Sequence, residues 1–173
     1  EAAGGGRRIV FHLERNDPNF DAKTGTWVIP VTESIVSTKS SLMIDGFSQA
    51  QYGGETNPKG PEVYIDASGF TNDLTVINNF FIVNGNVFLF FTGDQNWVRG
   101  LGFKLAGRII PGAVKFSSQY VLSELSSENR FTDNFVNITP DGEGFYQGSS
   151  LGVFLDRGTI NCLIEGNIIA VAR

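Results

Sequence analysis

Two side chains that often carry chemistry occur only once each in this 173-residue chain, His12 and Cys162. Because His12 lies in an apolar run and each residue is unique, we expect no conventional catalytic triad, no two-histidine zinc site, no haem and no internal disulfide. The apolar neighbours of Cys162 favour a packing role over a reactive thiol. The sequence therefore excludes several enzyme classes, and we expect no bound metal and no cofactor.

Carboxylates and arginines remain as the side chains that could react. Enzymes that act on polysaccharides use paired carboxylates, or a basic side chain beside carboxylates. The candidate catalytic residues are Asp66 and Arg99, which lie 33 positions apart, and Asp45 is a further acidic candidate. The same pair is also typical of a salt bridge on a solvated face, worth about 0–1 kcal/mol. We favour the salt bridge, because no carboxylates cluster around Arg99.

A spacing of 33 residues recurs along the chain, and it would position these side chains. It relates the apolar residues Ile65, Val98, Phe131 and Ile164. A coil that returns to the same side after each repeat stacks its strands in parallel, about 4.8 Å apart. The inward column must then be apolar in every coil. The spacing predicts a parallel β-solenoid, with a β-sandwich as the alternative.

Two further columns follow from the same alignment. The outward position next to the apolar residue is shared by Asp66, Arg99, Thr132 and Glu165. The position after it is shared by Gly100, Asp133 and Gly166. Glycine and aspartate tolerate the unusual backbone conformations that a corner requires. We therefore expect a corner of the coil at this point.

Short β-rich runs separated by turn-forming residues fill the rest of the chain, and no stretch of ten residues has a helical period. The composition agrees, with 21 glycines and 18% charged residues. We expect one all-β domain over residues 1–173, a coil of about five irregular turns. The two alternatives for this domain are a whole protein and a fragment or processed part of a longer secreted protein.

Four segments resemble a known family. They are residues 4–11, residues 44–49 (IDGFSQ) with 52–54, residues 63–68, and residues 98–103. In this order they are similar to right-handed parallel β-helix modules of the pectin-lyase-like superfamily. Such modules occur in large bacterial surface proteins that open with a Cys-Ser-Leu-Arg-Glu-Ala motif. The resemblance implies a right-handed parallel β-helix in an extracellular or cell-surface protein of a bacterium, and it implies no agreed activity.

Net charge and hydropathy limit the partners. The formal net charge is −5 and the isoelectric point is about 4.8, so we expect no nucleic-acid binding. The longest apolar run, residues 87–91, is much shorter than the roughly 20 residues of a membrane helix, so we expect no membrane insertion. Both faces of that run must be covered, one by the core and the other by a loop or another subunit.

These observations favour a structural protein without catalytic activity. We expect the solenoid to associate with copies of itself, through its ends or an apolar face, into a fibre or adhesin. The residues expected at the contact are Val87, Phe88, Leu89, Phe90, Phe91, Ile168 and Ile169. The alternative is a carbohydrate-active enzyme, a lyase or hydrolase, or a polysaccharide-binding module.

Overall fold

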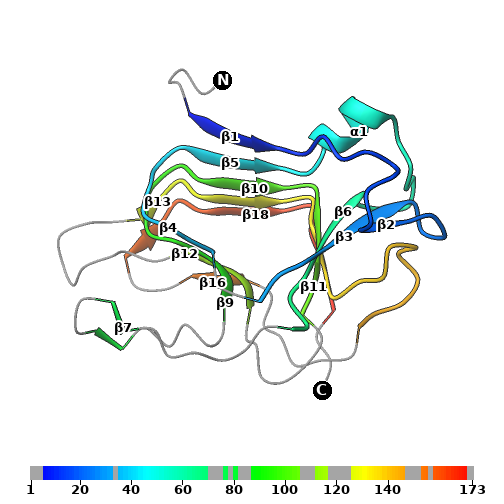
Figure 1. Ribbon diagram of the computed structural model, residues 1–173. Helices are drawn as coiled ribbons and strands as arrows, with labels where there is room; N and C mark the ends of the chain where they lie inside the picture. The colour runs from blue at the N-terminus through cyan, green and yellow to red at the C-terminus, as the bar shows by residue number, and fades with distance from the viewer. Residues whose placement is uncertain are drawn as a thin grey trace.

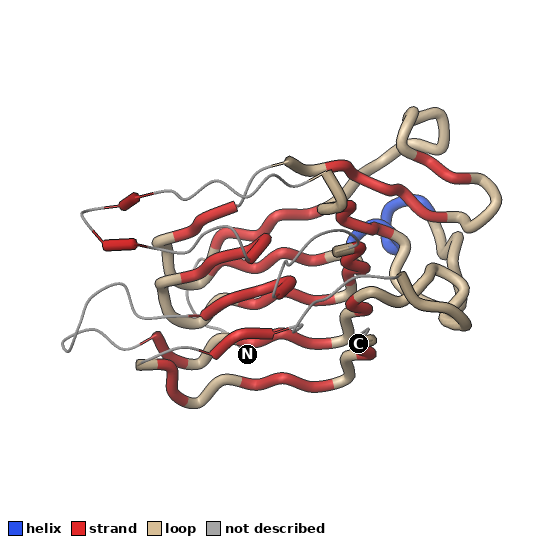
Figure 2. The backbone as a smooth tube through the Cα atoms, turned by 90° about the horizontal axis from the view of Figure 1, so that it is seen from below, coloured by secondary structure: helices blue, strands red, loops and turns tan. Residues whose placement is uncertain are grey.

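The chain winds as a coil through three sheets, here called sheets A, B and C, and the strands of successive coils stack within each sheet (Figure 1). The computed structural model describes residues 6–32, 35–69, 76–77, 80–81, 87–105, 112–116, 126–146, 153–155 and 158–170. Strands of successive coils lie side by side, as Figure 2 shows from below. The expected fold class, an all-β parallel β-solenoid, is confirmed.

Sheet A has five parallel strands in the order β1-β5-β10-β14-β18. Their bounds are β1 Arg7–Val10, β5 Leu42–Asp45, β10 Trp97–Arg99, β14 Arg130–Thr132 and β18 Leu163–Glu165. Sheet C has four parallel strands, β16 Val153–Leu155, β12 Gly112–Phe116, β9 Val87–Phe91 and β4 Ile35–Ser37. The chain therefore passes the same sides of the solenoid repeatedly.

Sheet B follows the order β19-β15-β11-β6-β3-β2. Its parallel strands are β19 Ile168–Ile169, β15 Phe135–Val136, β11 Leu101–Lys104, β6 Val63–Asp66 and β3 Thr26–Pro30, and β2 Phe20–Asp21 joins β3 in antiparallel direction. The remaining elements are the pairs β13 Ser126–Ser127 with β17 Thr159–Ile160 and β7 Val76–Ile77 with β8 Phe80–Phe81, and the helix α1 Ser48–Gly53. No helix in the described part is long and apolar enough to cross a membrane.

The register confirms most of the 33-residue repeat and corrects its first copy. Val98, Phe131 and Ile164 are paired across sheet A. Ile65 was expected to precede them, but the residue paired with Val98 is Ile44, 54 positions earlier. Ile65 lies in sheet B, where it pairs with Phe103. The coil that contains α1 and the following loop is longer than the later coils, so a constant spacing fails there.

The expected corner lies between sheets A and B. Gly100, Asp133 and Gly166 have φ values of 63°, 57° and 66°, which is the left-handed region that Gly and Asp tolerate best. A second corner lies before each of the strands β5, β10, β14 and β18 and was not predicted. There the positive-φ residues are Ser41, Gln95, Glu128 and Asn161. The strands β10, β14 and β18 lie between these two corners, and this limits each of them to a few residues.

Buried asparagines connect successive coils at these corners. The Asn134 side chain accepts a hydrogen bond from the Leu101 amide at 3.0 Å and donates one to the Val98 carbonyl at 3.1 Å. Asn129 in the same way accepts from the Asn96 amide at 2.9 Å. A buried backbone amide without a partner is costly. The ladder therefore satisfies backbone groups where the chain leaves the sheets.

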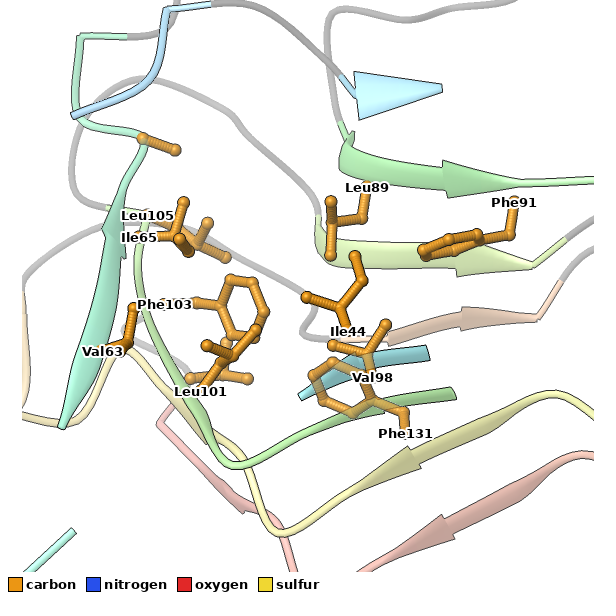
Figure 3. Close-up of a cluster of buried hydrophobic side chains, with 12 residues drawn as sticks. Ile44, Val63, Ile65, Leu89, Phe91, Val98, Leu101, Phe103, Leu105 and Phe131 are labelled. Carbon is orange, nitrogen blue, oxygen red and sulfur yellow. The ribbon is translucent and has the colours of Figure 1, made fainter. Parts of the chain in front are cut away.

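Inward side chains from all three sheets form one core, shown in Figure 3. Its members include Ile44, Val98 and Phe131 from sheet A, Val63, Ile65, Leu101, Phe103 and Val136 from sheet B, and Leu89 and Phe91 from sheet C. The ring centroids of Phe103 and Phe131 are 5.8 Å apart. These contacts join sheets A and B into a single packed column.

The N-terminal end of this column is partly covered. β2 pairs with the outer edge of β3, and Phe20 packs on Trp27 with 4.6 Å between ring centroids. Side chains of α1 hold the segment after β1, because Gln49 accepts from the Leu13 amide at 2.8 Å and donates to its carbonyl at 2.9 Å. Leu13 itself packs against the core.

Candidate functional site

The outer face of sheet A carries two columns of side chains. One column runs through Arg8, Met43, Trp97, Arg130 and Leu163, and the other through Val10, Asp45, Arg99, Thr132 and Glu165. The parallel register brings these residues together from coils that are 33 to 54 positions apart in the sequence. Arginine side chains are therefore concentrated on one face of an acidic protein.

Asp45 is the centre of a charged cluster on this face. Its side chain is fully buried. Arg99 donates from Nε and Nη2 to its two oxygens, at 2.9 Å each, and Arg8 donates from Nε at 3.1 Å and also from Nη2. Burial opposes ionisation of Asp45, but the hydrogen bonds from Arg99 and Arg8 outweigh it and lower its pKa. Asp45 is therefore an ionised anchor for two arginines.

Aromatic rings stack with the arginines. The Arg99 guanidinium lies 4.5 Å from the ring centre of Trp97 and 5.7 Å from that of Phe47, and Arg130 lies 5.6 Å from Trp97. The Trp97 indole nitrogen donates to the Thr132 hydroxyl at 2.9 Å. Cation–π contacts of this kind orient guanidiniums. This stack was not predicted from the sequence, because Trp97 and Arg130 are adjacent only through the register.

The two candidate catalytic residues do not meet. Arg99 was expected to share an outward column with Asp66, but its partner is Asp45 in sheet A. Asp66 lies in sheet B, where it pairs with Lys104 at 2.7 Å. The expected column was wrong for the same reason as the first repeat, the longer coil around α1. A lyase-like base beside Asp66 therefore has no support from this geometry.

A second polar cluster surrounds Asp66 on the outer face of sheet B. Burial opposes its ionisation, but hydrogen bonds from Lys104 and Ser68 lower its pKa overall. The Lys104 amine lies 5.5 Å from the ring centre of Tyr146. Tyr64 is 1% exposed, and burial raises its pKa. The described residues include no group of three or more His, Cys, Asp and Glu that could hold a metal ion.

The unique histidine and cysteine lie apart. His12 stacks on Tyr52 with 4.6 Å between ring centroids. Cys162 directly precedes β18, and its partly exposed thiol donates to the Ile160 carbonyl at 3.7 Å. Burial raises its pKa. The two residues therefore lie at opposite ends of the solenoid, His12 exposed and Cys162 partly exposed.

The C-terminal end of the solenoid exposes the ends of both core columns. In sheet A, Ile164 is 42% exposed, whereas Phe131 before it in the same column is fully buried. In sheet B, Ile169 is 37% exposed, whereas Val136 before it is fully buried. Ile168 is 50% exposed beside them. The edges of β18 and β19 carry no further strand among the described residues.

One face of the apolar strand β9 packs in the core, as expected. Leu89 and Phe91 are 2% and 1% exposed, so they face inward and are not available to a second subunit. The side chains of Val87, Phe88 and Phe90 lie outside the described residues. The part of the expected contact that the structure exposes is therefore Ile168 and Ile169.

Comparisons with family models, with curated proteins and with solved structures return no match for this chain. In the part of the chain that the structure describes, the protein is a parallel β-solenoid with an arginine-rich outer face and no strand beyond β18 and β19.

Proposed function

We propose that this chain is a structural module of an extracellular or cell-surface protein, without catalytic activity, and that it associates with a second copy through its C-terminal end. The observation that carries the proposal is the exposure of Ile164 and Ile169 at the C-terminal ends of two core columns whose central members are buried. Burying these side chains against a partner removes apolar surface from water, at roughly 25 cal/mol per Å².

The strands at this end are suited to pairing. Among the described residues no strand pairs with the outer edges of β18 and β19, and such edges recruit further strands unless lysine, proline or a covering segment blocks them. The edge residues are Leu163, Ile164, Glu165, Ile168 and Ile169. Only one of these five is charged. The edge therefore has few of the charged residues that block association between the sheet edges of monomeric proteins.

The two ends differ in sheet B, whereas in sheet A the core column is exposed at both ends, because Ile9 is 45% exposed. At the N-terminal end β2 already occupies the outer edge of β3. A copy that continued sheet B there would have to displace β2. We therefore favour a pair joined by its C-terminal ends around a two-fold axis over a head-to-tail fibre.

The family assignment is part of the same proposal. The parallel solenoid is the fold that the resemblance to pectin-lyase-like β-helix modules implies, which supports membership of that superfamily. Export to the surface of a bacterium follows from that membership, because the resembling modules belong to surface proteins.

Sedimentation velocity over a range of protein concentrations tests the association. The wild-type chain should shift from monomer to dimer, and Ile168→Lys should remain monomeric because it introduces a charge at the contact. Val10→Lys is the matched control, since Val10 is 41% exposed at the opposite end and its substitution should leave the dimer intact. A wild-type chain that stays monomeric at the highest concentration, or a dimer unaffected by Ile168→Lys, contradicts the proposal.

A further inference from the structure

A row of oxygen-bearing side chains crosses the N-terminal edge of sheet B, on the side away from the core. Asp21 of β2 is paired with Thr26 of β3. Glu62 lies beside Thr26, because the residues that follow them, Trp27 and Val63, are paired in register. Val63 belongs to the core, and successive side chains point to opposite faces, so Thr26 and Glu62 both face outward. The row therefore extends over three neighbouring passes of the chain.

Glu62 is the unusual member of this row. It is 5% exposed, and one oxygen of its carboxylate, Oε2, is buried without a hydrogen-bond partner. The other oxygen, Oε1, accepts from the Thr56 amide and lies 3.2 Å from the Thr56 hydroxyl. The ion pairs among the described residues do not include Glu62. A buried carboxylate is costly unless a cation or a full set of hydrogen bonds compensates its charge, so Glu62 lacks a partner.

Two hydroxyl groups connect the row to its exposed end. The Thr24 hydroxyl donates to Oδ2 of Asp21 at 2.9 Å and lies 2.8 Å from the Thr26 hydroxyl. With the Thr24 hydrogen on Asp21, the Thr26 hydroxyl donates to Thr24 and keeps lone pairs for another group. Thr26 is fully buried, whereas Asp21 is exposed. A ligand that enters from the side of Asp21 would therefore meet carboxylate and hydroxyl oxygens.

We propose that Asp21, Thr26 and Glu62 bind one Ca²⁺ ion. Calcium is a hard cation that takes oxygen ligands at about 2.3–2.6 Å, and water molecules complete its coordination. Neighbouring strands are about 4.8 Å apart, so the Cα atoms of Asp21 and Glu62 are separated by roughly 10 Å. An ion above Thr26 then lies within reach of both carboxylates. Their two negative charges balance the ion, and Oε2 of Glu62 gains the partner that it lacks.

Other metal ions fit this row less well. Magnesium needs near-ideal octahedral geometry at about 2.0–2.1 Å, whereas the spacing of Asp21, Thr26 and Glu62 is set by the pairing of the backbone. Zinc and copper prefer histidine or cysteine ligands, and the row contains neither. The flexible coordination of calcium is the best match for these three side chains.

Bound calcium would hold the N-terminal end of the solenoid together. Phe20 of β2 packs on Trp27 and covers this end of the column. An ion held by Asp21 and Glu62 ties β2 to the segment that precedes β6, so it should stabilise the fold. The site lies at the end opposite to β18 and β19, and it does not depend on the dimer described above.

Thermal unfolding of the full chain, treated with EDTA and then dialysed, tests the proposal with CaCl₂, MgCl₂ and NaCl at equal ionic strength. CaCl₂ at about 10 mM should raise Tm by about 3–10 °C, as expected for a dissociation constant of about 10⁻⁴–10⁻³ M. Isothermal titration calorimetry with CaCl₂ should give a single site per chain. An unchanged Tm in CaCl₂, or an equal rise in MgCl₂, overturns the proposal.

Three variants locate the ion. Glu62→Gln keeps the shape of the side chain and should abolish the rise in Tm with CaCl₂. Asp21→Asn changes an exposed residue, so it tests the site even if Glu62→Gln fails to fold, and it should weaken calcium binding about tenfold or more. Glu55→Gln is the control, since Glu55 is exposed next to Thr56 and should respond as the wild type does. The site is wrong if a folded Glu62 or Asp21 variant keeps the wild-type response, or if Glu55→Gln loses it.

Discussion

Arg99 donates two hydrogen bonds, each 2.9 Å long, to the two carboxylate oxygens of Asp45, which precedes it by 54 residues. The pair joins neighbouring coils on the outer face of sheet A and orients the Arg99 guanidinium between two aromatic rings. The longest insertion in the solenoid, with α1, lies between these two residues. The contact therefore fixes the register in the part of the coil where the regular repeat is lost.

Replacing Asp45 with asparagine should destabilise the fold by about 2–3 kcal/mol. Removal of one partner from a fully buried ion pair costs roughly 3–5 kcal/mol, and the partial exposure of Arg8 and Arg99 reduces that cost. Urea unfolding at neutral pH measures the change. Glu143→Gln is the matched control, because its ion pair with Lys59 is exposed on both sides, and it should have little effect. Equal effects of the two variants would contradict the assigned role of Asp45.

Stability should fall in acid because the pKa values of Asp45 and Asp66 are lowered in the folded state. Each carboxylate then contributes stability above its unfolded pKa, near 3.8, and loses it as the pH falls through the folded pKa. Urea unfolding from about pH 6 to pH 3 should show a constant free energy of unfolding that declines below about pH 4–5. Asp45→Asn should have a shallower decline than the wild type. An identical decline in both proteins would show that Asp45 does not contribute.

Asn134→Ala should cost about 2–4 kcal/mol, since it leaves the Leu101 amide and the Val98 carbonyl buried without their partner. Thermal unfolding followed by circular dichroism measures the loss. The exposed Asn16 supplies the control, and Asn16→Ala should unfold at nearly the wild-type temperature. A small effect of Asn134→Ala would mean that water replaces the amide and that the ladder is not structurally required.

Gly46→Ala should cost about 3 kcal/mol or more. The added Cβ would lie 2.0 Å from the Gly100 carbonyl oxygen, and backbone in the adjacent coil cannot move away without strain. Gly142→Ala controls for the general effect of adding a methyl group, because its nearest contact would be 3.5 Å away; its positive φ alone costs about 1–2 kcal/mol. Chemical denaturation compares the two variants, and equal losses would contradict the close approach at the corner.

The sequence was informative wherever the repeat is regular. Val98, Phe131 and Ile164 are inward residues of one column, and Gly100 and Gly166 form the corner after it, as their 33-residue spacing predicts. A periodic pattern records both features, since each coil must bury an apolar residue and turn at the same place.

The partners of Asp66 and Arg99 could not be predicted from that spacing. The coil with α1 is longer than the others, and no local pattern reveals how many residues an insertion adds. The asparagine ladder, by contrast, had a usable signal. Asn96 and Asn129 are 33 residues apart, as are Asn134 and Asn167, and polar residues that recur with the period of a solenoid indicate interior hydrogen bonds rather than solvated turns.

The central claim, association through the C-terminal end, is tested most directly by hydrogen exchange of individual backbone amides. The Leu163 and Ile168 amides donate into the solenoid, to the carbonyls of Asn129 and Asn134 at 2.9 Å each. Because successive amides of a strand point in opposite directions, those of Ile164 and Ile169 face the open edge. We predict that exchange at Ile164 and Ile169 slows as the protein concentration rises through the dimerisation range. Exchange at both amides that stays fast and independent of concentration would contradict the account.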